Sequence, residues 1–151
     1  MRGRHSAIGA IVLGGGIAGI VDIGAACAIN GFLDPITVCH VIAAGAIGRD
    51  AAMAGGLPTV ALGLVLQIAM SLLIAAIYAA GAQVLPVLRR RWLPAGLAFG
   101  VAVFFVMEFV VVPLSAIGHV PKFTPQSFGL NLLAMLLFGT IIAWFARTKR
   151  P

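Results

Sequence analysis

The chain has 151 residues, of which 62% are hydrophobic and only 9% charged, and its mean hydropathy is +1.13. A soluble domain is roughly 25% charged, so this composition excludes a water-soluble globule and predicts one transmembrane domain over residues 1–151. The formal net charge of +6 does not indicate nucleic acid, because the ten Lys and Arg residues stand at the ends of apolar runs, where they set membrane orientation.

The first apolar run covers residues 7–29 and contains one ionisable side chain, Asp22. At 1.5 Å per residue such a helix is roughly 35 Å long, enough to cross a bilayer core. Arg2 and Arg4 before the run, and Ala26-Cys27-Ala28 near its end, also resemble a signal peptide. The spanning length and Asp22 argue against cleavage, so we expect a first transmembrane helix.

The glycines of residues 14–19 match G-x-G-x-x-G, the pattern of a dinucleotide-binding loop. That site needs a preceding strand and a soluble βαβ unit, and the sequence has neither. Gly15 and Gly19, one helical turn apart, instead predict that a second helix packs closely here. Gly96 and Gly100 form the same kind of packing surface on a later helix.

Residues 30–57 are expected to leave the membrane on its outer face. Asp34 as N-cap and Pro35 at the first helical position predict the start of a short apolar helix over residues 35–47. This helix is too short to span a bilayer, so we expect it to be interfacial or re-entrant.

Three further apolar runs predict transmembrane helices, at residues 58–80, 94–112 and 126–145. Pro58 and Pro94 stand in the first turns of the runs at 58–80 and 94–112, and Pro113 directly follows the latter. Thr124 and Pro125 precede the run at 126–145. Proline is tolerated in a first turn and disfavoured beyond it, so it marks these boundaries. The fold class predicted is all-α, with four transmembrane helices and one short interfacial or re-entrant helix.

The basic residues predict the orientation. With both termini in the cytoplasm only Arg49 and Lys122 lie outside, which is the asymmetry of the positive-inside rule. The other eight lie inside: Arg2, Arg4, Arg89, Arg90, Arg91, Arg147, Lys149 and Arg150. Tyr78, Trp92 and Trp144 fall at the same inner interface. We expect a multi-pass protein of the bacterial inner membrane, in contact with anionic lipids at its cytoplasmic face.

The two cysteines, Cys27 and Cys39, are too few for a disulfide framework. Both lie near the same membrane face, so they could form a disulfide if that face is oxidising. Packed, reduced thiols are the favoured interpretation.

Each predicted transmembrane helix carries a polar side chain within its span. These are Asp22, Gln67, Glu108 and Asn131. Asp22 and Glu108 lie about seven and about five residues from the outer ends of their helices, so their depths differ by only ~3 Å. No span contains Lys or Arg. Insertion scales give a free-energy cost of ~3 kcal/mol for one charged side chain at the centre of the bilayer. The two acids are therefore expected to share a proton, to hold a cation, or to form hydrogen bonds as neutral acids.

The short helix is expected to cover an outward-facing vestibule and to bring His40 near its mouth. An unperturbed histidine titrates near neutral pH, so His40 could report external acidity to the two carboxyls. His119 is expected on the same side, and Arg49 is the nearby fixed positive charge.

Two interpretations of the polar set remain open: interhelical hydrogen bonds that only fasten the bundle, or a site for protons or small cations. A metal site has suitable ligand types, but the ligands have no i,i+3 or i,i+4 spacing, so we expect no metal. The sequence shows no nucleophile–base arrangement, phosphate loop or paired-histidine haem helix. We expect no cofactor and no enzyme.

Three segments carry a resemblance: residues 38–48 (VCHVIAAGAIG), 55–69 (GGLPTVALGLVLQIA) and 106–116 (VMEFVVVPLSA). With the glycine-rich first helix ending in Asp22, they resemble a group of small four-helix bacterial inner-membrane proteins of no assigned activity. More distantly, they resemble YagU-type membrane proteins linked to acid resistance. The resemblance covers residues 9–118, and PLSA is its most specific part. In that group glutamine usually replaces His40, histidine replaces Gln67 and asparagine replaces Glu108.

The resemblance implies the four-helix topology and leaves the mechanism open. The expected function is a small permeation or sensing module for protons or small cations. The alternative is a non-catalytic accessory or packing subunit. In either case we expect a homo-oligomer or a place in a larger membrane complex, with no nucleic acid.

Overall fold

The computed structural model describes residues 7–31 and 34–147. Over these residues the secondary structure is helical, without strands. Four helices are long and apolar enough to cross a membrane, namely Ala7–Ile29, Gly56–Val84, Trp92–Leu114 and Pro125–Ala146. The shorter apolar helix Pro35–Ile47 lies between the first two. The predicted fold class is confirmed. Of the basic residues used for the orientation, Arg2, Arg4, Lys149 and Arg150 lie outside the described residues.

The first helix and the short helix have the predicted bounds, whereas the other three are longer. The second begins at Gly56 and continues to Val84, and the fourth covers Pro125–Ala146. The third begins at Trp92 and continues through Pro113 to Leu114, although we expected it to end before that proline. Proline removes one hydrogen bond and its ring crowds the carbonyl four residues earlier, here that of Phe109.

A change of helix type accommodates Pro113. The third span consists of α7 (Trp92–Val106), a π-helical turn η2 (Met107–Val111) and α8 (Val112–Leu114). The wider π turn ends two residues before the proline and contains Phe109. The Val112 N–H bonds to the Met107 carbonyl oxygen five residues earlier, instead of the one four residues earlier as in an α-helix. The first span likewise has a π turn, η1 (Ala10–Gly14), before α2 (Gly15–Ile29).

Side-chain caps fix where α3 (Pro35–Ile47) and α9 (Pro125–Ala146) begin. An Asp34 carboxylate oxygen accepts a hydrogen bond from the Thr37 backbone N–H at 2.8 Å, as the sequence predicted. At α9 the Thr124 hydroxyl accepts from the Ser127 N–H at 3.1 Å, and the Ser127 hydroxyl accepts from the Thr124 N–H at 2.9 Å. This reciprocal pair satisfies two otherwise unpaired donors.

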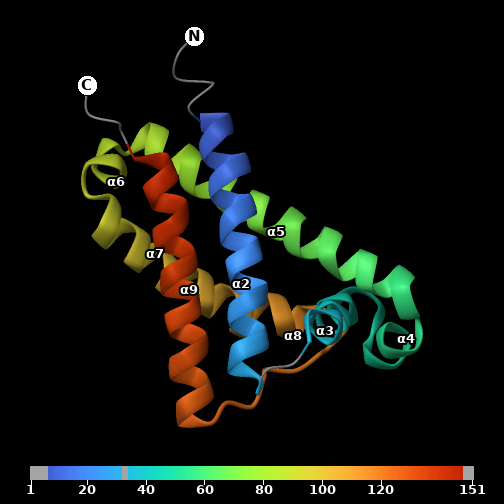
Figure 1. The fold of residues 1–151 in the computed structure, drawn as a ribbon. Coiled ribbons are helices and arrows are strands. Elements are labelled where there is room, and N and C mark those ends of the chain that lie inside the picture. Colours follow the sequence, from blue (N-terminus) through green and yellow to red (C-terminus); the bar gives the residue numbers. More distant parts are fainter. Residues whose placement is uncertain (1–6, 32–33, 148–151) are drawn as a thin grey trace.

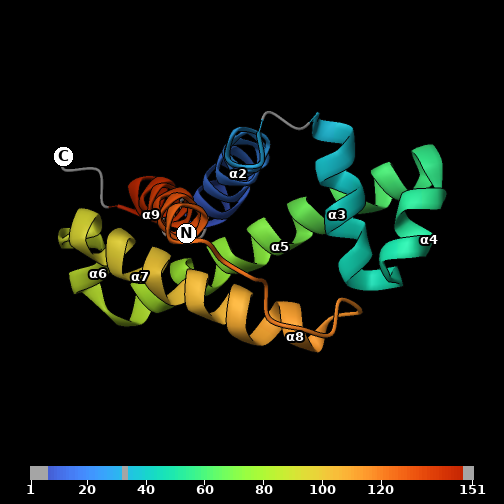
Figure 2. The same ribbon diagram turned by 90° about the horizontal axis from the view of Figure 1, so that it is seen from below.

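The long helices lie together at one end and diverge at the other. In Figure 1, α2 and α9 lie side by side, and α5 (Gly56–Val84) crosses near their upper ends and runs away from them below. The turn α6 (Pro86–Arg90) lies at the upper end. The view from below shows α3 and α4 (Arg49–Ala54) against the distant half of α5 (Figure 2). The short helix therefore occupies the region where α2 and α5 have separated.

Small residues set the helix spacing. A Cβ on Gly96 would lie 2.8 Å from the Ala143 Cβ of α9, and one on Gly100 would meet the main chain of the same helix. A Cβ on Gly15 would lie 3.0 Å from the Ala75 Cβ of α5. The main buried cluster is rich in alanine: Ala18, Ala75, Tyr78, Ala82, Phe138, Ile142 and Ala143.

Both predicted packing surfaces are used within the chain. Gly15 and Gly19 contact α5, and Gly96 and Gly100 contact α9, because both helix pairs come close enough for backbone contact.

Candidate functional site

The centre of the polar set is a hydrogen bond between the first two transmembrane helices. The Gln67 amide donates to an Asp22 carboxylate oxygen at 2.8 Å, and the same nitrogen lies 3.4 Å from the Gly19 carbonyl oxygen. Both side chains are half-buried. The Asp22 carboxyl therefore has a neutral partner, which pairs one oxygen and leaves its charge uncompensated.

Ser71 on α5 holds this crossing in place. Its hydroxyl donates to the Gln67 carbonyl oxygen at 2.8 Å, and the side chain is only 2% exposed. A Cβ on Gly19 would lie 2.5 Å from the Ser71 hydroxyl oxygen, so only glycine allows α2 to approach here. The sequence placed Ser71 one turn from Gln67, but the spacing alone did not show that it faces Gly19.

Glu108 lies in the π turn η2 and is half-buried. Within the part of the chain that the structure describes, its carboxyl receives no hydrogen bond. Asp22 and Glu108 are seven and six residues from the last residues of their helices, Ile29 and Leu114, so they lie at similar depths. The two acids thus share a depth in the bundle without a direct hydrogen bond to each other in the described residues.

Asn131 does not join this pair. Its amide donates to the Ser127 carbonyl oxygen of its own helix at 2.8 Å. A side chain that bonds the preceding turn satisfies itself locally, so hydropathy and depth alone could not predict that it would turn away from the acids.

His40 lies on α3 and contacts the N-terminal end of α5. Its Nε2 is 3.1 Å from the carbonyl oxygen of Gly56. Gly56 is eleven residues from Gln67 on the same helix, which corresponds to roughly 16 Å along the axis. The structure therefore places His40 at the Gly56 end of α5, apart from the Asp22–Gln67 bond. His119 is exposed in the loop before α9, and its Nδ1 is 2.9 Å from the Ile117 carbonyl oxygen.

Arg49 is exposed at the start of α4. That helix lies on α3 and α5, away from α2 (Figure 2). The structure therefore does not place this positive charge beside the two carboxyls, although the sequence left it as their nearby candidate counter-ion.

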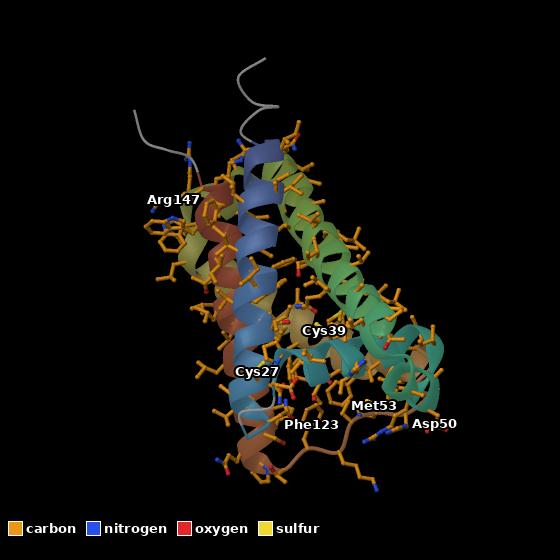
Figure 3. The ribbon with its side chains drawn as sticks, turned by 45° about the vertical axis from the view of Figure 1, so that its right-hand side comes forward. Cys27, Cys39, Asp50, Met53, Phe123 and Arg147 are labelled. Carbon is orange, nitrogen blue, oxygen red and sulfur yellow. The ribbon has the colours of Figure 1, made fainter. Side chains whose placement is uncertain are left out.

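A group of phenylalanines lies around η2, which the sequence analysis did not single out. Phe123, in the loop before α9, lies below α3 (Figure 3). Its ring centroid is 6.1 Å from that of Phe104 and 6.5 Å from that of Phe109. Phe128 completes the contact, with its centroid 5.0 Å from Phe104. The loop is thereby attached to the C-terminal half of the third span.

The two cysteines are free thiols, Cys39 buried and Cys27 half-buried. Burial raises the pKa of the Cys39 thiol, and the nearby Cys27 raises it further. A buried thiol of raised pKa carries little thiolate and is unreactive.

The opposite end of the bundle is aromatic and basic. The Arg147 guanidinium carbon lies 3.2 Å from the centroid of Trp144 and 5.7 Å from that of Trp92 (Figure 3). The two indole rings meet edge to face at 5.0 Å. A small recess beside them is lined by Arg89 and alanines of three helices. This end is therefore separate from the Asp22–Gln67 bond.

Among residues 7–31 and 34–147 no three His, Cys, Asp or Glu side chains are grouped as a metal site would require. The polar set can instead accept protons or a single cation at two carboxyls. No family model, curated protein or solved structure matches the chain. The resemblance to small four-helix inner-membrane proteins and to YagU-type proteins therefore stays a prediction.

Proposed function

We propose that the protein is a small, non-enzymatic permeation or sensing module for protons or small cations. Its site is the outward-facing polar set around Asp22 and Glu108. The observation that carries the proposal is the Asp22 carboxyl, which lies in an apolar span with a neutral amide as its partner. No Lys or Arg occurs in any of the four spans.

The chemistry follows from charge. The Gln67 amide lowers the cost of a buried carboxylate but does not neutralise it, and Glu108 adds a second like charge at a similar depth. In surroundings of low dielectric constant, two such charges cost more than one. Binding one proton or one monovalent cation removes that repulsion, so the pair is suited to take up and release a single positive charge.

The proposed membrane is the bacterial inner membrane, with both termini in the cytoplasm and the α3 end outside. Arg89, Arg90 and Arg91 stand at the α6 end, where Arg147 covers two tryptophans. Aromatic and basic side chains of this kind are typical of a cytoplasmic interface, where they meet anionic lipid headgroups.

Proteoliposomes that enclose a pH-sensitive dye test the proposal. Under an imposed potential, the wild type should carry protons faster than protein-free vesicles, and the double variant Asp22→Asn, Glu108→Gln should fall to that background. Asp50→Asn is the matched control, because Asp50 is an exposed acid on α4. Equal background flux in all three proteins would contradict permeation. A survival defect of the double variant in acid, at unchanged abundance, would then support sensing, and unchanged survival would contradict it.

A specific observation favours the second candidate, a packing or accessory subunit. The Asp22–Gln67 bond and the Gly19–Ser71 contact join the same two helices, as a purely structural fastener would. Asn at position 22 keeps an oxygen that can accept the Gln67 hydrogen bond. A packing subunit should therefore tolerate Asp22→Asn and Glu108→Gln, with assembly and phenotype intact.

For either function we propose a homo-oligomer or a place in a larger membrane complex. The support is the side of the first helix that no other helix of this chain covers, where a Cβ on Gly16 or Gly24 would meet nothing within 4 Å. Mass measurement in mild detergent and in native nanodiscs tests this, and a monomer in both, without a co-purifying chain, would contradict it.

A further inference from the structure

Glu108 is surrounded along its helix by aromatic rings. Phe104 and Phe105 precede it by one turn, and Phe109 follows it directly. Phe105 and Phe109 are stacked, with centroids 5.7 Å apart and planes at 28°. They are 48% and 44% exposed, on the surface that lipid would surround. Phe104 is fully buried, and its ring meets Phe128 edge to face.

The site lacks the oxygen ligands that a strongly hydrated ion needs. Mg²⁺ and Ca²⁺ take roughly six to eight oxygens, and other small hydrated ions must likewise replace their lost water. Here the described residues offer two separated carboxyls, one of them already bonded to an amide, and no cluster of three metal-binding side chains. Such an ion would find few replacements for its water here, so it would bind weakly and be released readily.

A large cation with alkyl or aryl groups has the opposite requirements. Its charge is diffuse and weakly hydrated, so little is lost when water leaves, and its groups pack against apolar side chains. Ring faces attract such cations electrostatically within about 6 Å of the centroid. Glu108 follows Phe105 by one helical turn and directly precedes Phe109, so it supplies a counter-charge on the same stretch of helix as the two rings.

We propose that the Glu108 site takes a lipophilic organic cation, of the quaternary ammonium or phosphonium class, between the Glu108 carboxylate and the rings of Phe105 and Phe109. This inference rests on the proposed function and goes beyond its protons and small cations, because it adds an organic cation that the same carboxyl binds more tightly. Because both rings are exposed to the lipid side, the cation enters from the outer half of the bilayer.

Equilibrium dialysis of radiolabelled tetraphenylphosphonium against the protein in nanodiscs tests this, with empty nanodiscs as background. Wild type should bind saturably, and a large excess of NaCl should not displace the probe beyond general screening. Phe105→Leu should weaken binding about threefold to thirtyfold, the range expected for one ring–cation contact. Glu108→Gln should weaken it at least tenfold, whereas Glu108→Asp should bind, because it keeps the charge.

Two matched controls should bind as the wild type does: Phe99→Leu, whose ring instead contacts Tyr78, and Asp50→Asn. If Glu108→Gln does not fold, Phe105→Leu and Glu108→Asp still decide. No saturable binding, equal affinity in Phe105→Leu and wild type, or specific displacement by Na⁺ would overturn the inference. Proton flux that depends on Asp22 and Glu108, without phosphonium binding, would overturn the inference alone and leave the proposed function standing.

Discussion

At Gly100 a single added methyl group would meet the main-chain carbonyl oxygen of Met135, and at Gly139 it would meet that of Gly96. Backbone cannot move aside as a flexible side chain can, so these glycines fix the distance between α7 and α9. Gly16 has the same residue type in a transmembrane helix but open space around its Cβ position. The residue type is thus visible in the sequence, whereas the need for it is visible only in the packing.

We predict that Gly100→Ala destabilises the protein by about 1–3 kcal/mol, the usual cost of overpacking a close contact. Gly16→Ala should leave the free energy of unfolding unchanged, apart from a small gain in helix propensity. Unfolding in mixed micelles with increasing denaturing detergent measures both. Equal stability of the two variants would contradict the packing described.

Asp34 gives a prediction about pH. Its carboxylate accepts hydrogen bonds from the Thr37 N–H and hydroxyl, and the pKa of this exposed carboxyl is therefore below its usual value. The pKa of Asp34 is thus lower in the folded than in the unfolded protein. The stabilisation by the cap is therefore fully present at pH values above the unfolded pKa, about 3.9, and is lost as the pH falls through the lower, folded pKa. The protection of the Thr37 and Val38 amides, measured relative to the intrinsic exchange rate at each pH, should thus fall only below about pH 4.

Asp34→Asn should keep this protection and remove its pH dependence, because asparagine also caps helices. Protection that fades between pH 7 and 5 in the wild type would contradict the assignment.

Among the elements, the spans could be predicted from the sequence because hydrophobic length and terminal proline are local signals. The continuation through Pro113 could not, because it depends on the π turn at Met107–Val111. The pairing of Asp22 with Gln67 depends on how α2 crosses α5, which no spacing within one helix contains. For the same reason Asn131 and His40 were assigned to a shared site, although each contacts a backbone carbonyl elsewhere.

The α2–α5 crossing should show a measurable coupling. In a double-mutant cycle with Asp22→Ala and Gln67→Ala, we expect a coupling free energy of about 0.6 kcal/mol, and no more than about 1.7 kcal/mol, as for other hydrogen bonds between transmembrane helices. Unfolding of the two single variants and the double variant in micelles gives the value. Strict additivity would show that the bond contributes nothing to the crossing, and Thr140→Ala with Gln67→Ala should be additive as a distant control.

For the whole molecule, the α6 turn and the loop before α9 lie at opposite ends of the bundle (Figure 1). A variant without native cysteines, given one cysteine at position 90, should react with a membrane-impermeant maleimide only after the inner membrane is opened. Positions 4 and 148 should behave in the same way, and position 119 should react in intact spheroplasts. Labelling of position 90 from outside would reverse the proposed orientation and place the polar set on the cytoplasmic side.

The central claim is that the two intramembrane carboxyls exchange protons with the outside, which a sealed packing contact would not do. Infrared difference spectroscopy of reconstituted protein, perfused with buffers of different pH, records the stretch of protonated carboxyls directly. After the signal of the surface acids that all variants have in common is subtracted, we predict a carboxyl band that changes with bath pH. The band should appear in the wild type and in Asp50→Asn. This band should be absent in Asp22→Asn, Glu108→Gln. A difference spectrum that is identical in the wild type and the double variant across the pH range would contradict the account.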